Sequence, residues 1–467
     1  MRYKMPLKRR TVFAVLCLVA LLPLTAAADQ FLDACLGIAA ARDKRLTVAG
    51  EQISLAKYRV TRSARGFFPF ISAERTFSNG KTLTEGRYEG EMFGLRASQI
   101  LFEGGRTRYT YSFDRMTLEA ARVNFTKTRE ELFYKIKLAY YEMLSLKMEY
   151  VALRKACDEI DKLNEKVQAE FRAKAISELD LREAMNFQEK TQNLIAASEI
   201  NLLLATRKMT TFVSVESLDD IPVSVPDALS DYVPEMSFTL KDCMGFIATN
   251  NLDVRLYQVQ TLMSDAKRKI NRSKAIPKVY LDGFYGKSGE AFVNQSVPMT
   301  TVWSVSGRLA WTLWGNTFEA VQSTEKTDPT QITDVAQRTE SSSLQMRIGL
   351  FDDLGYFVDG KEAKVTLHQT QADYREMMDK AYLDLHKAYN DYENSLRSAR
   401  QLKKEIEIKR RQLEVLRKRN QLYEVQTVQV MEETWKYADA ISSYARAVYQ
   451  NYASVTEMER LTLISLR

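Results

Sequence analysis

The chain has 467 residues and a formal net charge of +7, from 67 lysines and arginines against 60 acidic residues. Five of the basic residues lie within the first ten, and without them the two signs of charge nearly balance. A nearly neutral chain has no general attraction for phosphates, so the composition excludes a charge-driven nucleic-acid-binding protein.

The N-terminus has the pattern of a secretory signal peptide. Basic residues precede an apolar run, Thr11–Leu24, and the small residues Ala26–Ala28 follow before Asp29. A retained membrane anchor is the weaker alternative, because the run is too short to span a bilayer comfortably. We therefore expect residues 1–28 to be a signal peptide. No later stretch has the roughly 18 uncharged apolar residues of a spanning helix, so the mature chain would enter a membrane as a β-barrel.

Three cysteines remain after the signal, namely Cys35, Cys157 and Cys243. Their odd number and wide spacing match neither a disulfide framework nor a metal site. Cys35 follows Asp29 and Asp33 rather than the apolar run, which argues against lipid attachment. We expect all three to be small buried residues without a chemical role.

Two segments of the chain, 208 positions apart, match without a gap. The matched residues are Leu32, Cys35, Gly37, Ala40 and Pro69 in the first segment and Leu240, Cys243, Gly245, Ala248 and Pro277 in the second. A repeat of this length indicates an internal duplication. We expect two repeats, 29–220 and 238–467, joined by a proline-containing linker at 221–237.

Each repeat is predicted to contain a helix, two strands and two long helices. In the first repeat we expect a helix over Phe31–Arg65, a strand over Phe70–Ser78 and a second strand that ends at Gly104 and Gly105. These two glycines are predicted to form the strand-to-helix hinge, because Arg106–Val213 contains neither Gly nor Pro.

The second repeat is predicted to begin with a helix over Leu240–Lys274 and a strand over Lys278–Tyr285. Its next strand, Val302–Leu313, alternates with a period of two residues. We expect one face of that strand to contact lipid, with Trp303, Val305, Leu309, Trp311 and Leu313. The opposite face, with Ser304, Ser306, Arg308 and Thr312, is expected to line the lumen of a barrel.

A polar stretch, Asn316–Ser343, has no counterpart in the first repeat. We interpret it as an inserted hairpin, with strands near Thr317–Ser323 and Ser342–Leu350. Its placement relative to a membrane is not predicted by the sequence.

A second region without Gly or Pro runs from Lys361 to Arg467. The first long helix of each half, expected over Arg115–Arg172 and over Gly360–Leu422, would be roughly 87 Å and 95 Å long at 1.5 Å per residue. Apolar residues repeat every seven positions in the first region, which is typical of a left-handed coiled coil. The two rows are Ala139, Leu146, Leu153, Ile160 and Val167, and Met143, Tyr150, Cys157, Asn164 and Phe171. The second region has helical spacing from Ala381 to Ile406.

No pattern in the chain predicts catalysis. Its two histidines, His368 and His386, lie on one predicted helix, and no Ser-His-Asp set, metal-ligand spacing or phosphate-binding loop is present. We therefore predict no catalytic residues, no cofactor and no metal, and no enzyme activity.

Several motifs resemble the TolC-like family of outer-membrane efflux proteins. They are the paired starts Leu32–Ala39 and Leu240–Ile247, the switch Leu101–Arg106, the stretch Glu170–Leu181 and the final helix around Tyr449–Arg460. Lys174 and Gln426 stand where the family usually has a glycine at the turn.

The resemblance implies a mainly α fold with a membrane β-barrel portion. Long coiled-coil helices would form an α-barrel in the periplasm, and each half would contribute a β-hairpin to a trimeric 12-stranded barrel in the outer membrane. The expected function is passive export in a tripartite efflux or type I secretion system, with a periplasmic adaptor and an inner-membrane pump as partners. The alternative is a secreted or surface-attached coiled-coil protein or adhesin without a pore.

Each repeat also needs a reversal between its two long helices, and these two tips are the candidate docking and gating sites. The residues expected there are Phe171, Arg172, Lys174, Ser177, Tyr423, Glu424, Gln426 and Thr427. The alternative is a plain solvated turn. The missing glycines would be tolerated if the turn residues need no positive φ.

Overall fold

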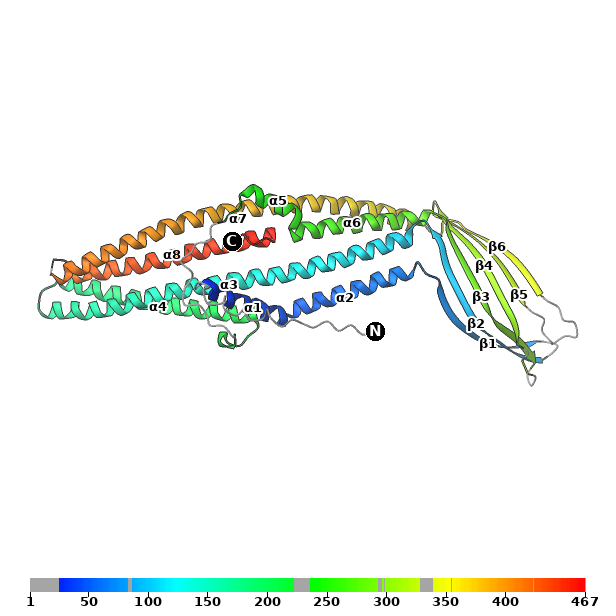
Figure 1. Cartoon of the computed structure of the whole chain (residues 1–467), viewed down its shortest axis with the longest axis horizontal. Coiled ribbons are helices and arrows are strands. Elements are labelled where there is room, and N and C mark those ends of the chain that lie inside the picture. The colour runs from blue at the N-terminus through cyan, green and yellow to red at the C-terminus, as the bar shows by residue number, and fades with distance from the viewer. Residues whose placement is uncertain are drawn as a thin grey trace, which may run out of the picture. The chain divides into compact units, whose positions relative to one another are not determined.

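A computed structural model describes residues 25–82, 86–221, 236–292, 296–297, 299–327, 339–353, 355–422 and 424–466. Most of the expected signal peptide, most of the expected linker and Tyr423 lie outside the described residues. The elements, in chain order, are α1 (Thr25–Arg42), α2 (Lys44–Arg65), β1 (Phe70–Thr82), β2 (Gly86–Glu103), α3 (Arg106–Arg172), α4 (Glu178–Val213), η1 (Leu218–Asp220), α5 (Leu240–Asn250), α6 (Leu252–Arg272), η2 (Ser273–Ala275), β3 (Lys278–Phe292), β4 (Thr300–Leu313), β5 (Asn316–Thr327), β6 (Thr339–Gly349), α7 (Gly355–Gln421) and α8 (Thr427–Thr462) (Figure 1).

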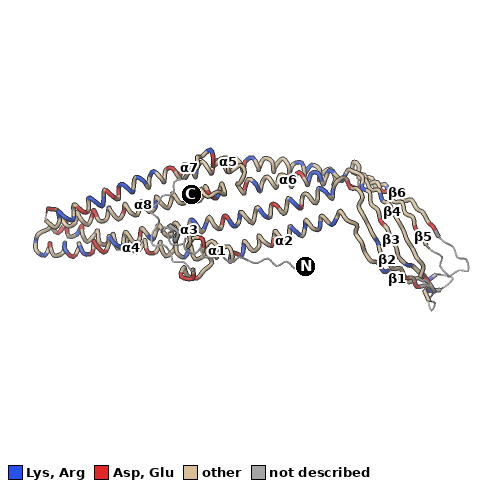
Figure 2. Tube along the Cα trace, in the orientation of Figure 1, with Lys and Arg blue, Asp and Glu red and all other residues tan. Residues whose placement is uncertain are grey.

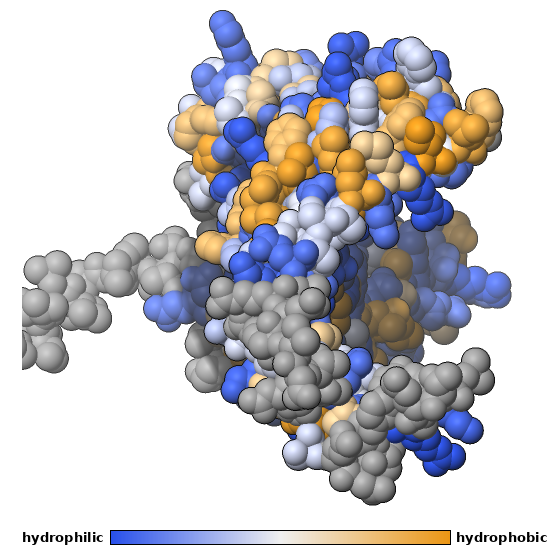
Figure 3. Space-filling view, turned by 90° about the vertical axis from the view of Figure 1, so that its right-hand side faces the viewer, coloured by the Kyte–Doolittle hydropathy of each residue, from blue (hydrophilic) through white to orange (hydrophobic). Residues whose placement is uncertain are grey.

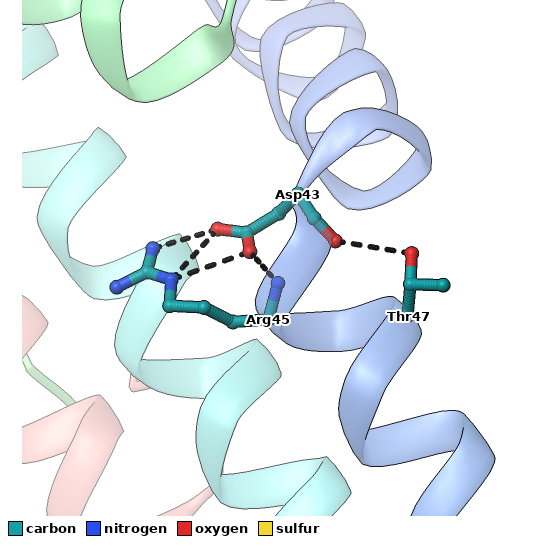
Figure 4. Close-up of polar contacts among 3 residues, drawn as sticks. All are labelled: Asp43, Arg45 and Thr47. Atoms are coloured by element: carbon teal, nitrogen blue, oxygen red, sulfur yellow. Dashed lines mark hydrogen bonds and ion pairs between the residues drawn. The ribbon is translucent and has the colours of Figure 1, made fainter.

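The helix expected at the start of each repeat is interrupted, at Asp43 in the first and at Asn251 in the second. These two positions are 208 residues apart and correspond to each other in the predicted duplication. Asp43 caps α2, because its Oδ1 accepts a hydrogen bond from the backbone N of Arg45 at 2.6 Å (Figure 4). The Arg45 side chain also donates to this carboxyl group and lowers its pKa. The prediction of one continuous helix was therefore wrong at both positions.

The described chain divides into two compact units, and each unit takes segments from both repeats. One unit contains Thr126–Asn251 and Lys380–Arg467 together with the chain up to Thr47, and the other contains Val48–Phe125 and Leu252–Asp379. The first is called the helical unit below and the second the sheet unit. Residues of both charge signs are interspersed along the long helices (Figure 2).

The core of the helical unit follows the predicted heptad. Most of the predicted seam residues of α3 are buried, namely Ala139, Met143, Leu153, Cys157, Ile160, Asn164 and Val167. Near the C-terminal end of α3, Ile160 and Val167 pack with Ala184 of α4 and with Met431 of α8. Phe171 ends the seam with 37% of its surface exposed. The apolar stripe of α3 therefore packs against two other helices, as a coiled-coil seam predicts.

The sheet unit contains a single antiparallel sheet with the strand order β1-β2-β3-β4-β5-β6. The hairpin expected from each repeat is present as β1–β2 and β3–β4, and the inserted stretch supplies a third, β5–β6. The described chain therefore contributes six strands rather than four. Strands β1 and β2 are longer than expected and the second inserted strand ends at Gly349.

Candidate functional site

The sheet has two chemically different faces, and the strand register assigns each residue to one of them. Side chains of directly paired residues lie on the same face. Val305, Leu309 and Trp311 of β4 are exposed, and their register partners on neighbouring strands are mostly apolar too. The other exposed apolar residues of this face are Ile71, Phe77, Phe93, Leu95, Phe102, Leu281, Tyr285, Phe318, Leu344, Met346 and Ile348. We call this surface the apolar face; Figure 3 shows apolar side chains gathered over the strands.

The opposite surface, here called the polar face, carries ion pairs and serines. On this face the Arg308 guanidinium lies 4.4 Å from the ring centre of Tyr280 and pairs with Glu319 at 3.6 Å. Arg96 pairs in the same way with Glu74 of the neighbouring strand, at 2.8 Å. Ser304, Ser306 and Thr312 share the face with Arg308, as the period-2 pattern predicts.

The turn from β2 into α3 is formed by Gly104 and Gly105, with φ of 64° and 82°. A side chain at Gly104 would meet Ile276, because a Cβ there would lie 2.7 Å from the Cβ of that residue. Both the positive φ and the close approach favour glycine.

The second repeat changes from strand to helix after β6 rather than after β4. Trp314 and Gly315 have φ of 51° and 80° and form the tight two-residue turn into β5. The exit from β6 is held against this turn, because the Oδ1 of Asn316 accepts a hydrogen bond from the N of Phe351 at 2.9 Å. Asp352 likewise accepts from the N of Thr317 at 3.1 Å. The inserted hairpin is therefore fixed at its base.

The α3–α4 tip contains a positive φ at a residue that is not glycine. Lys174 has φ 58°, and its N donates to the carbonyl of Phe171 while the N of Ala175 donates to that of Glu170. These two bonds define a Schellman ending, for which glycine is the usual residue. The condition under which the missing glycine would be tolerated, a turn without positive φ, is therefore not met at Lys174. Lys174 adopts the strained conformation instead.

Ser177 caps the N-terminus of α4 at this tip. Its Oγ accepts a hydrogen bond from the N of Asp180, and the Asp180 carboxylate accepts one from the N of Ser177 at 3.0 Å. This reciprocal capping box starts α4. Arg172, Lys174 and Ser177 are all exposed.

The α7–α8 tip closes in a similar way, with the N of Glu424 donating to the carbonyl of Arg419 at 3.0 Å. Glu424 and Gln426 are exposed, and Gln426 precedes α8 without a side-chain capping bond. Thr427 differs from the other predicted tip residues, because only 1% of its surface is exposed. It therefore lies behind the surface of the tip in the single chain.

Thr427 belongs to a polar cluster that joins the two tips, here called the tip tie. Its Oγ1 donates to the carboxylate of Glu170 at 2.9 Å and accepts from the Nδ2 of Asn420 at 3.1 Å. The Oδ1 of Asn420 accepts from the Nζ of Lys166 at 2.6 Å. Glu170 and Lys166 come from α3, whereas Asn420 and Thr427 come from α7 and α8. Lys166, Glu170 and Asn420 were not predicted from the sequence. The spacing of four residues between Lys166 and Glu170 was the only local signal for this cluster.

The cysteines are buried and weakly acidic. Burial raises the pKa of Cys35 to about 12, and burial together with Asp161 raises that of Cys157 to about 11. Burial also raises the pKa of Cys243. Because the thiolate is the reactive form of cysteine, such thiols are poor nucleophiles and poor ligands.

Among the residues that the structure describes, no group of three or more His, Cys, Asp and Glu side chains is arranged to hold a metal ion. In the same part of the chain, no helix combines the length and apolarity needed to cross a membrane.

Hairpins joined by long antiparallel helices define the fold of the outer-membrane channels. The structure is similar to that of the outer-membrane protein VceC from Vibrio cholerae, with a TM-score of 0.71 and 11% identity over 93% of this chain and 97% of that chain. It is also similar to the MtrE outer-membrane channel of Neisseria gonorrhoeae in its open state (TM-score 0.70, 13% identity, 94% and 90% covered). A third similar structure is the CmeC outer-membrane channel of Campylobacter jejuni (TM-score 0.68, 13% identity, 94% and 86% covered).

Residues 35–212 match the family model described as outer membrane efflux protein. No curated protein sequence matches the chain. The family match covers residues 35–212, and the fold over 93–94% of the chain is similar to that of these outer-membrane channels.

Proposed function

We propose that the chain forms, as a homotrimer, the outer-membrane conduit of a tripartite efflux or type I secretion system. Substrates would pass through it without energy input, from a periplasmic adaptor and an inner-membrane pump to the exterior. The observation that carries this proposal is the sheet with one exposed apolar face and one polar face. A sheet of this kind satisfies its faces when several copies close around a water-filled lumen in lipid.

The apolar face is assigned to lipid and the polar face to the lumen. Trp303, Val305, Leu309, Trp311 and Leu313 of β4 are then lipid-facing. Exposed Val, Leu and Trp side chains at adjacent positions are unfavourable in water and favourable against acyl chains. Arg308 and its ion pair with Glu319 remain in the aqueous lumen, where the charges keep their hydration.

The exposed residues of the two tips are assigned to adaptor docking. Phe171, Arg172, Lys174, Glu424 and Gln426 form this docking set, because each presents its side chain to solvent. Ser177 and Thr427 are assigned to holding the tips in shape, through the capping box and the tip tie. Charges dominate the docking set, so we expect electrostatic recognition of a partner.

The channel is tested by the conductance of the purified protein in a planar bilayer. We expect stepwise currents from trimers. A trimer that never conducts, even with tip residues substituted, would contradict the channel and would favour a structural coiled-coil protein.

Docking is tested with charge reversals at the tips. The variant Lys174→Glu combined with Glu424→Arg should abolish export in cells, and crosslinkers placed at Lys174 and Gln426 should capture an adaptor protein. The matched control is Lys162→Glu, a charge reversal at an exposed position of α3 that precedes the tip. The control should export normally, and both variants should insert equally well in the outer membrane. Normal export by the double variant would contradict docking at the tips.

A further inference from the structure

The inserted hairpin β5–β6 changes the edge of the sheet that is open to a partner. In the described sheet, β1 pairs with β2 alone and β6 pairs with β5 alone. Two unpaired edges present rows of backbone N–H and C=O groups, which must be satisfied by another strand once lipid replaces water. If the hairpin lies in the membrane, the backbone groups along the open edge of β6 therefore need another strand as their hydrogen-bond partner.

The amphipathic pattern shows that the hairpin continues the sheet. On β6, Leu344, Met346 and Ile348 lie on the apolar face with more than half of their surface exposed. Ser343, Gln345 and Arg347 alternate with them on the polar face. A hairpin that projected into water would gain nothing from this alternation, whereas a membrane strand requires it.

The register also agrees with strands that are tilted in a membrane. Ile71 lies one residue from the end of β1 that joins α2, and it is in register through β2–β5 with Ser342. Ser342 lies seven residues from the end of β6 that joins the helical part. This offset of six residues over five pairings corresponds to a tilt of about 40°, at 3.3 Å per residue and 4.8 Å between strands. Membrane barrels have tilts of about 35–45°.

We infer that β6 pairs with β1 of a second copy of the same chain, so that the inserted hairpin is part of the closed barrel. This inference rests on the proposed channel function. An even number of strands per chain makes β6 and the next β1 antiparallel. In a trimer, three sheets of six strands would close into eighteen strands rather than twelve, and the lumen would be correspondingly wider.

Charge complementarity supports the same partner and suggests a register. If Arg347 lies opposite Glu74 of the next copy, then Glu340 lies opposite Lys81 and Leu344 opposite Phe77. The first pair lies on the polar face and the second and third pairs lie on the apolar face. One register thus matches two opposite charges and an apolar pair, each of which favours cross-strand pairing.

Disulfide trapping in the full-length protein tests the pairing. Ser306, Ser323 and Ser343 occupy one register row on β4, β5 and β6, all on the polar face. In separate proteins that lack the native cysteines, one of these three serines is replaced by cysteine. Each of these proteins also carries a second cysteine on β1, either Ser78→Cys or Thr76→Cys. The two β1 positions cover two registers that keep the faces matched. Oxidation in the outer membrane should link chains covalently from Ser343→Cys, and the Ser323→Cys and Ser306→Cys proteins should remain unlinked.

Links from Ser306→Cys with none from Ser343→Cys would overturn the inference, because β4 would then be the edge strand. Trimers that still conduct would in that case leave the channel function intact. Loss of both conductance and every interchain link would instead contradict the channel function itself.

A second pair of variants tests whether the hairpin contacts lipid. Met346 is 74% exposed on the apolar face, and its neighbour Gln345 lies on the polar face. Met346→Arg should reduce the amount of assembled trimer by roughly 30-fold or more if the residue lies near the middle of the bilayer. Gln345→Arg should assemble normally. Equal assembly of the two variants would place the hairpin in water and overturn the inference.

Discussion

Replacing Thr427 by valine should loosen the tip tie. Valine has nearly the shape of threonine but lacks the hydroxyl that donates to Glu170 and accepts from Asn420. A hydrogen bond to a charged group contributes about 1.5–3 kcal/mol. Because the Glu170 side chain is 20% exposed, water replaces part of the lost bond. We therefore expect the free energy of local opening at the tip to fall by about 1–2 kcal/mol.

Amide hydrogen exchange of the assembled protein measures this opening. A loss of about 1.4 kcal/mol corresponds to tenfold faster exchange, which we expect for the first turns of α8 and the last turn of α3. Exchange in the core around Tyr140 and Tyr452 should not change, because that region of the helical unit is packed separately by aromatic stacking.

Thr427→Ser is the matched control, since serine keeps the hydroxyl and loses only a methyl group. It should exchange much more slowly at the tip than the valine variant. Equal exchange in the wild-type and valine proteins would refute the reasoning, because the hydrogen bonds of the tip tie would then contribute nothing to closing the tip. Faster exchange in the serine variant as well would show that packing of the methyl group, which valine keeps, also contributes to closing the tip.

Four further predictions concern the sheet, the cysteines and the strained turn. Leu309→Arg should destabilise the assembled trimer by about 2–4 kcal/mol if Leu309 lies near the bilayer midplane, whereas the Arg308→Leu variant should assemble normally. If a trimer assay gave the reverse result, the lipid-facing and lumen-facing sides of the sheet would be exchanged. The rate of alkylation of Cys157 in the folded protein should rise tenfold per pH unit up to about pH 11, because its pKa is raised to about 11. The buried thiol should contribute fully to stability below the ordinary thiol pKa, and this contribution should be lost as the pH rises from there through about 11. A plateau of the alkylation rate near pH 8.5 would contradict the raised pKa. Replacement of all three buried cysteines by alanine should leave export intact, and loss of export from a well-assembled variant would show a functional thiol. Lys174→Gly should leave the fold unchanged and raise the melting temperature slightly, because glycine relieves a positive φ that costs lysine about 1 kcal/mol; a lower melting temperature would show that the lysine side chain stabilises the turn.

The sequence by itself determined the elements whose signal is local. The alternation in Val302–Leu313 fixed the two faces of β4, because side chains alternate along any extended strand. The heptad from Ala139 to Val167 predicted the buried seam of α3, since residues seven apart lie on one side of a helix. The helix break at Asp43 also had a local signal, because Asp43 and the corresponding Asn251 are both residue types that cap helices. The continuous apolar pattern around them favoured an unbroken helix instead.

Only the tertiary structure decided which distant residues meet. The tip tie joins Glu170 to Thr427, which are 257 positions apart, and no local pattern encodes such a contact. The positive φ of Lys174 was hidden for the same reason, because an intrinsic preference for glycine is overridden when packed helices on both sides impose the turn. The inserted hairpin could be recognised as two strands, but its place beside β4 depends on backbone hydrogen bonds and on the contacts of Asn316 and Asp352. Periodicity assigns a residue to a face, whereas the neighbours of that face are set by how the chain folds back on itself.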